Sequence, residues 1–265
     1  MTRTARDRVI IFDFDGTITV GDGPVLAYAE QVATRLAPGL ADGFRAAVTA
    51  GLHGRTGTVT TLTTDAIDDY DLVRQVAVTH GADASVLSAS YLASRELLAT
   101  EHAVIWAPPL TPPSGTRTPG RDDLASWLRR LSTRAYLVLA TNAPATGLDR
   151  ALAVLGVTDA FDEVRTSVGK PAGMHALADE MLARGPVLSV GDVWHNDLEP
   201  VWARGGATAL LTRGRAGDAR ATYRADTLDG LVPGITAWAD ATAEPHQLHH
   251  AHPVPHLTTT AKADL

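Results

Sequence analysis

The sequence contains no cysteine and no long apolar run, and both absences exclude classes of protein. Without cysteine, the 265-residue chain has no disulfide, no thiolate nucleophile and no cysteine-ligated zinc or iron–sulfur site. No stretch approaches the ~18 apolar residues of a membrane-spanning helix. Residues 1–8 are charged, and Asp13 and Asp15 interrupt the apolar run that follows. We therefore expect no secretory signal, no membrane partner and a cytoplasmic location.

Lysine is nearly absent, and acidic residues outnumber basic ones. Lys170 and Lys262 are the only lysines among 23 basic residues, so arginine supplies the rest. Against 30 acidic residues this leaves a formal net charge of -7, which argues against nucleic acid as a partner. A lysine in such an arginine-rich chain indicates a position where a compact ammonium is needed.

The chain opens with one strand pattern and continues with a long helical region. Residues 9–15 form a short apolar run before Gly16-Thr17, as expected of a buried parallel strand. Apolar residues then recur at helical spacing, and no strand pattern interrupts them before about residue 105. Helices are predicted over 24–37, 43–50, 65–80 and 83–102. The glycine-rich stretch 51–57 predicts a flexible turn.

After a proline-rich linker at 107–120, helices and strands alternate. This alternation predicts a parallel sheet with helices on both faces, which is the α/β fold class. Strands are expected at 135–140, 161–164, 186–190 and 207–211, and helices at 121–132, 145–155, 172–184, 197–204 and 228–240. We assign residues 1–21 and 107–243 to an α/β core, 22–106 to an inserted helical domain, and 244–265 to a disordered polar tail.

Polar residues follow four of the expected strands at the point where each strand ends. Ligands of open parallel sheets bind at that edge, so we expect these side chains to converge. The four groups are Asp13-Phe14-Asp15-Gly16-Thr17, Thr141-Asn142, Gly169-Lys170-Pro171, and Gly191-Asp192 through Asp197. The aspartates would form an oxygen-rich site suited to Mg²⁺.

The same residues suit phosphoryl transfer. Crowded carboxylates repel one another, and a divalent cation would relieve that repulsion. A lysine and a threonine hydroxyl beside them can hold a multiply charged anion, for which phosphate is the natural candidate. Each motif alone is explained by an ordinary turn or helix cap. Their shared placement at strand ends favours a functional site that works through an aspartyl phosphate.

In these four motifs the sequence resembles the haloacid dehalogenase-like hydrolases. The family's Asp-x-Asp-Gly-Thr pattern corresponds to residues 13–17, its Thr or Ser to Thr141, its lysine to Lys170, and its Gly-Asp-x-x-x-x-Asp to residues 191–197. The resemblance covers roughly residues 8–20 and 117–240. It implies a Rossmann-like core with an all-helical C1 cap inserted after the first strand, and such caps exclude water and contact the substrate.

The resemblance also implies roles. Asp13 would be the nucleophile that attacks phosphorus, Asp15 the general acid and base, and Lys170 the cation that neutralises Asp13 and the transferring group. The phosphoryl oxygens would be bound by Thr141 and by backbone amides near Phe14 and Asn142. Mg²⁺ would be held by Asp13, the backbone carbonyl of Asp15, and Asp192, with Asp197 either as a further ligand or as a partner of the ligands.

Substrate recognition would fall to the cap. His53 and Arg55, in the glycine-rich stretch, are the candidates, and Arg55 could bind a second anionic group; both also fit ordinary exposed turn residues. The expected reaction is Mg²⁺-dependent hydrolysis of a small phosphorylated metabolite, such as a sugar phosphate, phosphoglycolate or a nucleotide. The alternatives are a phosphomutase similar to β-phosphoglucomutase and, from another class, a non-catalytic binding or regulatory protein.

Three other branches of the superfamily are disfavoured by single residues. Dehalogenases lack the second aspartate, and transport ATPases have threonine there, whereas this chain has Asp15. Phosphonoacetaldehyde hydrolases form a Schiff base through a cap lysine, and segment 22–105 contains no lysine.

Overall fold

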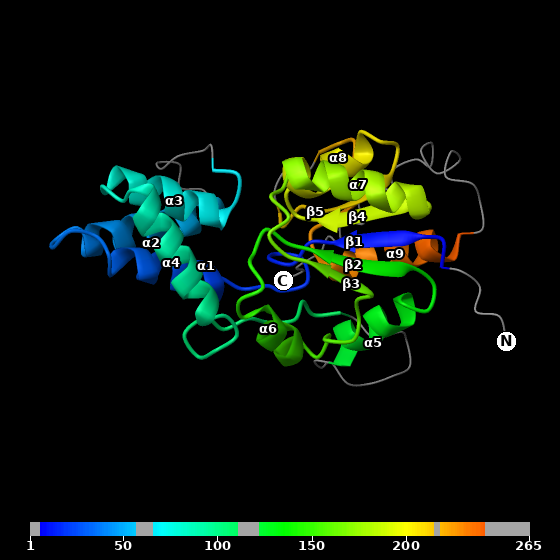
Figure 1. Ribbon diagram of the computed structural model, residues 1–265, viewed down its shortest axis with the longest axis horizontal. Helices are drawn as coiled ribbons and strands as arrows, with labels where there is room; N and C mark the ends of the chain where they lie inside the picture. Colours follow the sequence, from blue (N-terminus) through cyan, green and yellow to red (C-terminus); the bar gives the residue numbers. More distant parts are fainter. Residues whose placement is uncertain (1–5, 57–65, 111–121, 215–217, 242–265) are drawn as a thin grey trace, which may run out of the picture.

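The computed structural model describes residues 6–56, 66–110, 122–214 and 218–241, without the side chains of 54–56 and 122–123 (Figure 1). Most of the proline-rich linker and the whole histidine-containing tail therefore lie outside the described residues. Within these ranges the chain forms a parallel sheet covered by helices and a separate group of helices beside it. No described helix is long and apolar enough to cross a membrane.

In the described part of the chain the sheet has six parallel strands, in the order β3-β2-β1-β4-β5-β6. This is the strand order of Rossmann-like folds, whose ligands bind where the order reverses. The strands are β1 (Val9–Phe12), β2 (Tyr136–Ala140), β3 (Glu163–Arg165), β4 (Val187–Gly191), β5 (Ala207–Leu211) and β6 (Tyr223–Ala225). The sequence pattern predicts the first five but misses β6, which has three half-buried residues and therefore no apolar run.

Strand β1 shows why a continuous apolar run predicts a central strand. Ile10 and Phe12 belong to the core beneath α5 (Asp122–Leu131), α6 (Leu148–Leu155) and α9 (Leu228–Asp240). Val9 and Ile11 belong to the core on the opposite face, beneath α7 (Ala172–Arg184) and α8 (Glu199–Trp202). Because alternate side chains point to opposite faces and both faces are covered, every residue of β1 is buried.

The helix expected over 197–204 begins differently. A wide π-turn, η1 (Trp194–Leu198), precedes the short helix α8. Such turns are frequent at functional sites. Here Asp197 faces inward: its Oδ2 accepts a hydrogen bond from the Val193 amide, and its carbonyl accepts one from Ser189 Oγ.

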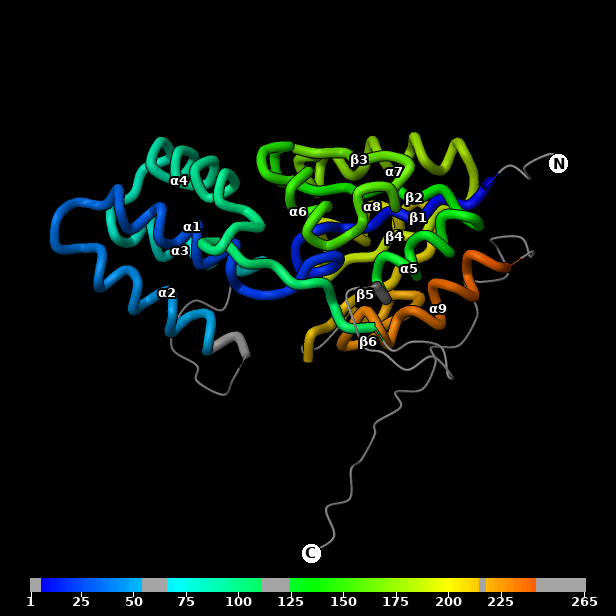
Figure 2. Tube along the Cα trace, turned by 90° about the horizontal axis from the view of Figure 1, so that it is seen from below, coloured from blue at the N-terminus to red at the C-terminus, as the bar shows by residue number. Residues whose placement is uncertain are grey.

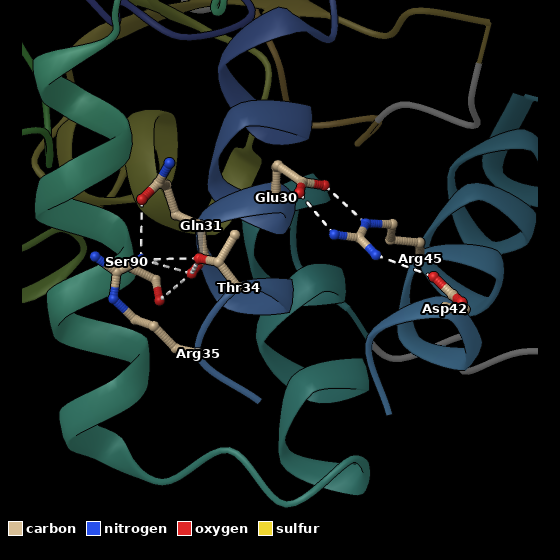
Figure 3. A network of polar contacts seen from close by, with 7 residues as sticks. All are labelled: Glu30, Gln31, Thr34, Arg35, Asp42, Arg45 and Ser90. Carbon is tan, nitrogen blue, oxygen red and sulfur yellow. Dashed lines mark hydrogen bonds and ion pairs between the residues drawn. The ribbon is translucent and has the colours of Figure 1, made fainter. Parts of the chain in front are cut away.

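The described residues of the inserted segment form four helices, called here the helical insert. They are α1 (Gly23–Ala33), α2 (Ala41–Thr56), α3 (Asp69–Thr79) and α4 (Ala84–Glu96), and they have their own apolar core. Figure 3 shows how polar contacts join three of them: Ser90 on α4 donates to the Gln31 carbonyl on α1, and Arg45 on α2 pairs with Glu30 on α1.

The prediction of a flexible turn at 51–57 is wrong for the residues described, because α2 continues through Thr56. The glycine there serves helix packing. A Cβ added to Gly51 would lie 2.9 Å from Leu72 Cδ2 on α3, so glycine lets the two helices approach closely.

Two connections join the helical insert to the core, and they pair with each other. Val20 and Trp106 exchange backbone hydrogen bonds of 2.9 and 3.1 Å in an isolated antiparallel bridge. In both ribbon and tube views β1 runs from the N-terminal side toward the insert, so the carboxyl ends of the strands face it (Figures 1 and 2).

Candidate active site

A cleft lies between the carboxyl edge of the sheet and the helical insert. The core lines it with residues from all four predicted motifs: Asp13, Asp15, Thr141, Asn142, Lys170, Asp192 and Asp197. The insert contributes Tyr28, Asp68, Asp69, Tyr70, Asp71, Arg74 and Tyr91. The four motifs therefore converge on one cleft, as expected from the sequence.

Lys170 bridges two of the aspartates. Its Nζ lies 2.7 Å from Asp13 Oδ1 and 2.8 Å from Asp197 Oδ1, and its side chain is only 2% exposed. Burial alone would lower the pKa of Lys170, but the charges of Asp13 and Asp197 outweigh burial and raise it, so the ammonium stays charged. Burial raises the pKa of Asp197 to about 6 against the opposing charge of Lys170.

The loop after β1 holds Asp13 in place. Thr17 Oγ1 donates a 3.1 Å hydrogen bond to Asp13 Oδ2, and the Asp13 amide donates to the Val190 carbonyl of β4. Gly16 has φ +88°, and a Cβ there would lie 2.7 Å from Asp192 Oδ2. Only glycine therefore fits between the two acidic motifs.

Thr141 and Asn142, which follow β2, also line the core side of the cleft. The Thr141 hydroxyl, which is buried, accepts a hydrogen bond from the Ala143 amide. Asn142 Oδ1 accepts one of 2.7 Å from the Lys170 amide, which ties the lysine loop to the end of β2. Asn142 thus caps no helix, since α6 begins only at Leu148. Phe14 buries its ring in the core, so only its backbone could face a ligand.

Asp13, Asp192 and Asp197 are the residues that fit a metal ion. One ligand oxygen from each lies within 4.8 Å of the others in the described part of the chain. Hard carboxylate oxygens at this spacing suit Mg²⁺. The Asp15 carboxylate is not in this group, so its expected metal contact depends on the backbone carbonyl alone. Arg213, with a guanidinium nitrogen 3.3 Å from Asp192 Oδ2, neutralises part of the acidic charge.

The helical insert supplies a residue that sequence reasoning missed. Arg95 on α4 is 1% exposed, and its Nη1 lies 3.6 Å from Asp15 Oδ1 and 3.3 Å from the Tyr70 hydroxyl. Burial raises the pKa of Asp15 above its ordinary value even though the charge of Arg95 opposes the rise. Arg95 has no sequence signal of its own, because it is one arginine among many on an ordinary helical pattern.

The structure describes one of the two insert side chains proposed from sequence to contact the substrate. His53 is exposed on the last turn of α2 and is not among the residues that line the cleft. The side chain of Arg55 lies outside the described part of the chain. Among the described residues of the insert, the arginine that lines the cleft is Arg74, which pairs with Asp71 at 2.5 Å.

The parallel sheet, with an aspartate–lysine pair at the point where its strand order reverses, defines a Rossmann-like α/β enzyme. A family model for haloacid dehalogenase-like hydrolases matches residues 8–200, and the chain belongs to this family of hydrolases.

Solved structures agree on the fold. Magnesium-bound YfnB from Bacillus subtilis is 15% identical with a TM-score of 0.54, and the match covers 86% of this chain and 98% of that one. A HAD phosphatase from Thermococcus onnurineus is 21% identical with a TM-score of 0.50, covering 86% and 97%. At these identities the similarity shows the fold alone. No curated protein matches the chain by sequence.

Proposed function

We propose that the protein is a Mg²⁺-dependent phosphatase that hydrolyses the phosphomonoester of a small metabolite through an aspartyl phosphate on Asp13. The proposal rests on the contact between the buried Lys170 ammonium and Asp13 Oδ1, which are 2.7 Å apart. This ammonium keeps the nucleophile oriented and offsets the charge of an approaching phosphoryl group. Asp15 follows two residues later and lines the same cleft.

In the proposed reaction, Asp13 is the nucleophile and Asp15 transfers the protons. Asp13 attacks phosphorus while the bond to the leaving oxygen breaks, and Asp15 donates its proton to that oxygen. The Asp15 carboxylate then takes a proton from the water that attacks the aspartyl phosphate, which releases phosphate and restores Asp13. Thr141 and the backbone near Phe14 and Asn142 bind the phosphoryl oxygens.

The metal would be held by Asp13, Asp192 and Asp197. When bound, Mg²⁺ supplies positive charge to the phosphoryl oxygens and to the crowded carboxylates. Removal of this ion should therefore leave a folded protein without hydrolytic activity.

The test is phosphate release from a panel of phosphorylated metabolites with Mg²⁺. Wild type should hydrolyse phosphomonoesters, and Asp13→Asn should lose activity by ~10⁴-fold or more, because the covalent route is removed. If wild type releases no phosphate from any ester, the protein is not a phosphatase. Isomerisation of a sugar phosphate with little net release would instead identify a phosphomutase.

A further inference from the structure

We infer that Arg95 is a positioning residue for the general acid Asp15, so that the helical insert completes the proton-transfer machinery of the core. This inference rests on the proposed phosphatase function. Arg95 approaches Oδ1 of Asp15 and leaves the second carboxylate oxygen for the leaving group. It acts through Asp15 rather than on the substrate, because it is not among the residues that line the cleft.

The burial of Arg95 needs an explanation that the insert alone does not provide. Its Nε and Nη2 are buried and have no hydrogen-bond partner, and its only described polar contacts are Tyr70 and Asp15. Burying a guanidinium with unsatisfied donors is unfavourable unless a nearby negative charge compensates it. The Asp15 carboxylate supplies that charge when the acid is ionised, and Asp15 belongs to the core.

The end of α4 that carries Arg95 is fastened to the core. Arg150 on α6 donates 2.6 and 2.7 Å hydrogen bonds to the carbonyls of Glu96 and Leu98. These bonds satisfy carbonyls that the end of a helix leaves free. They also fix the backbone beside Arg95 relative to the sheet, so the guanidinium can hold the Asp15 carboxylate in a defined place.

A positioned general acid matters most when the leaving group is poor. An alkoxide must be protonated as it departs, whereas p-nitrophenolate can leave without a proton. The value of kcat/KM reports steps up to the release of the leaving group, so it isolates this role from the later hydrolysis of the aspartyl phosphate. Loss of Arg95 should therefore penalise alkyl phosphates more than p-nitrophenyl phosphate.

The experiment compares Arg95→Met with wild type on p-nitrophenyl phosphate and on an alkyl phosphate that wild type hydrolyses. We expect kcat/KM to fall by about 10- to 100-fold for the alkyl ester and by less than about threefold for the aryl ester. Arg95→Lys should recover part of the alkyl activity. In the Asp15→Asn background, Arg95→Met should cause no further loss, since the residue to be positioned is gone.

The matched control is Arg45→Met. Arg45 is also an arginine of the insert paired with carboxylates, but its partners Glu30 and Asp42 lie on α1 and α2 away from the cleft (Figure 3). It should leave both kcat/KM values unchanged. Arg95→Met leaves the Asp15 carboxyl without its buried partner and should lower the thermal midpoint. The readout is therefore the ratio of the two kcat/KM values, which a smaller folded fraction does not change.

An equal fall for both esters would overturn the inference and assign Arg95 a merely structural role. If wild type hydrolyses neither ester, nor any other, the proposed function itself fails. If wild type is active and Arg95→Met lacks leaving-group selectivity, only the role of Arg95 fails.

Discussion

The Lys170 ammonium lies 2.7 Å from Asp13 Oδ1 and is almost completely buried there. Two carboxylates, Asp13 and Asp197, share this one cation. A compact ammonium fits between them, whereas the broad, planar guanidinium of arginine would not. This contact explains why a lysine is present at this position of an arginine-rich chain.

Replacing Lys170 should damage both activity and folding. Lys170→Met leaves two buried carboxylates unpaired, and breaking a buried ion pair costs about 3–5 kcal/mol. It also removes the cation beside the transferring group, so kcat should fall by ~10²-fold or more. Urea unfolding and phosphate release measure the two effects. Full activity in Lys170→Arg would contradict the steric argument.

Gly16→Ala should disturb the site without touching a functional group. At φ +88° an L-residue is strained by about 1–2 kcal/mol. The new methyl group would also press on Asp192, because a Cβ at this position would lie only 2.7 Å from Asp192 Oδ2. We expect weaker Mg²⁺ activation together with this loss of stability. Gly39→Ala, also at positive φ but with open space around it, is the control for backbone strain alone.

Mg²⁺ should stabilise the folded protein through the three clustered carboxylates. A ligand that binds only the folded state adds about 2.7 kcal/mol at a hundred times its Kd, which a thermal shift detects without any substrate. Asp192→Asn should weaken this shift, and Asp42→Asn, an exposed aspartate of the insert, should not. If the Mg²⁺-induced thermal shift of Asp192→Asn equals that of wild type, the ion binds at a site that does not include Asp192.

The raised pKa of Asp15 predicts a pH dependence of stability. A carboxyl group whose pKa rises on folding favours the folded state while it is protonated. Its contribution is lost as pH rises from the ordinary value of 3.8 through the raised value of the folded protein. Metal-free wild type should therefore lose stability across this interval relative to Asp15→Asn. Denaturant unfolding in the presence of a chelator, from pH ~4 to ~7, measures the free energy of unfolding of both proteins. Parallel plots of this free energy against pH would contradict the prediction.

Much of the core could be predicted because each signal is local. Residues 172–184 and 228–240 carry complete helical patterns, and α7 and α9 have those bounds. β1 has a continuous apolar run because both of its faces are covered. The motif residues follow strand ends, and parallel strands bring those ends to one edge, so the convergence of Asp13, Lys170 and Asp192 follows from the order of elements.

The insert was harder to predict, because its details depend on contacts between distant segments. The glycines of 51–57 indicated a turn, but Gly51 serves the close packing of α2 against Leu72. The same holds for one residue of the core: Asn142 could be an ordinary helix cap from its sequence position, yet its Oδ1 accepts a hydrogen bond from the Lys170 amide across the site. Neither partner can be read from neighbouring residues.

The α/β order of elements, the four motifs and the chemistry of their side chains are predictable from the sequence, because they depend only on chain order and residue type. Which residues of the insert meet the motifs depends on contacts between segments that are far apart in the chain. Arg95 reaches Asp15 while His53 is exposed, because Arg150 holds the end of α4 beside the core and the buried guanidinium next to that end lies against the Asp15 carboxyl.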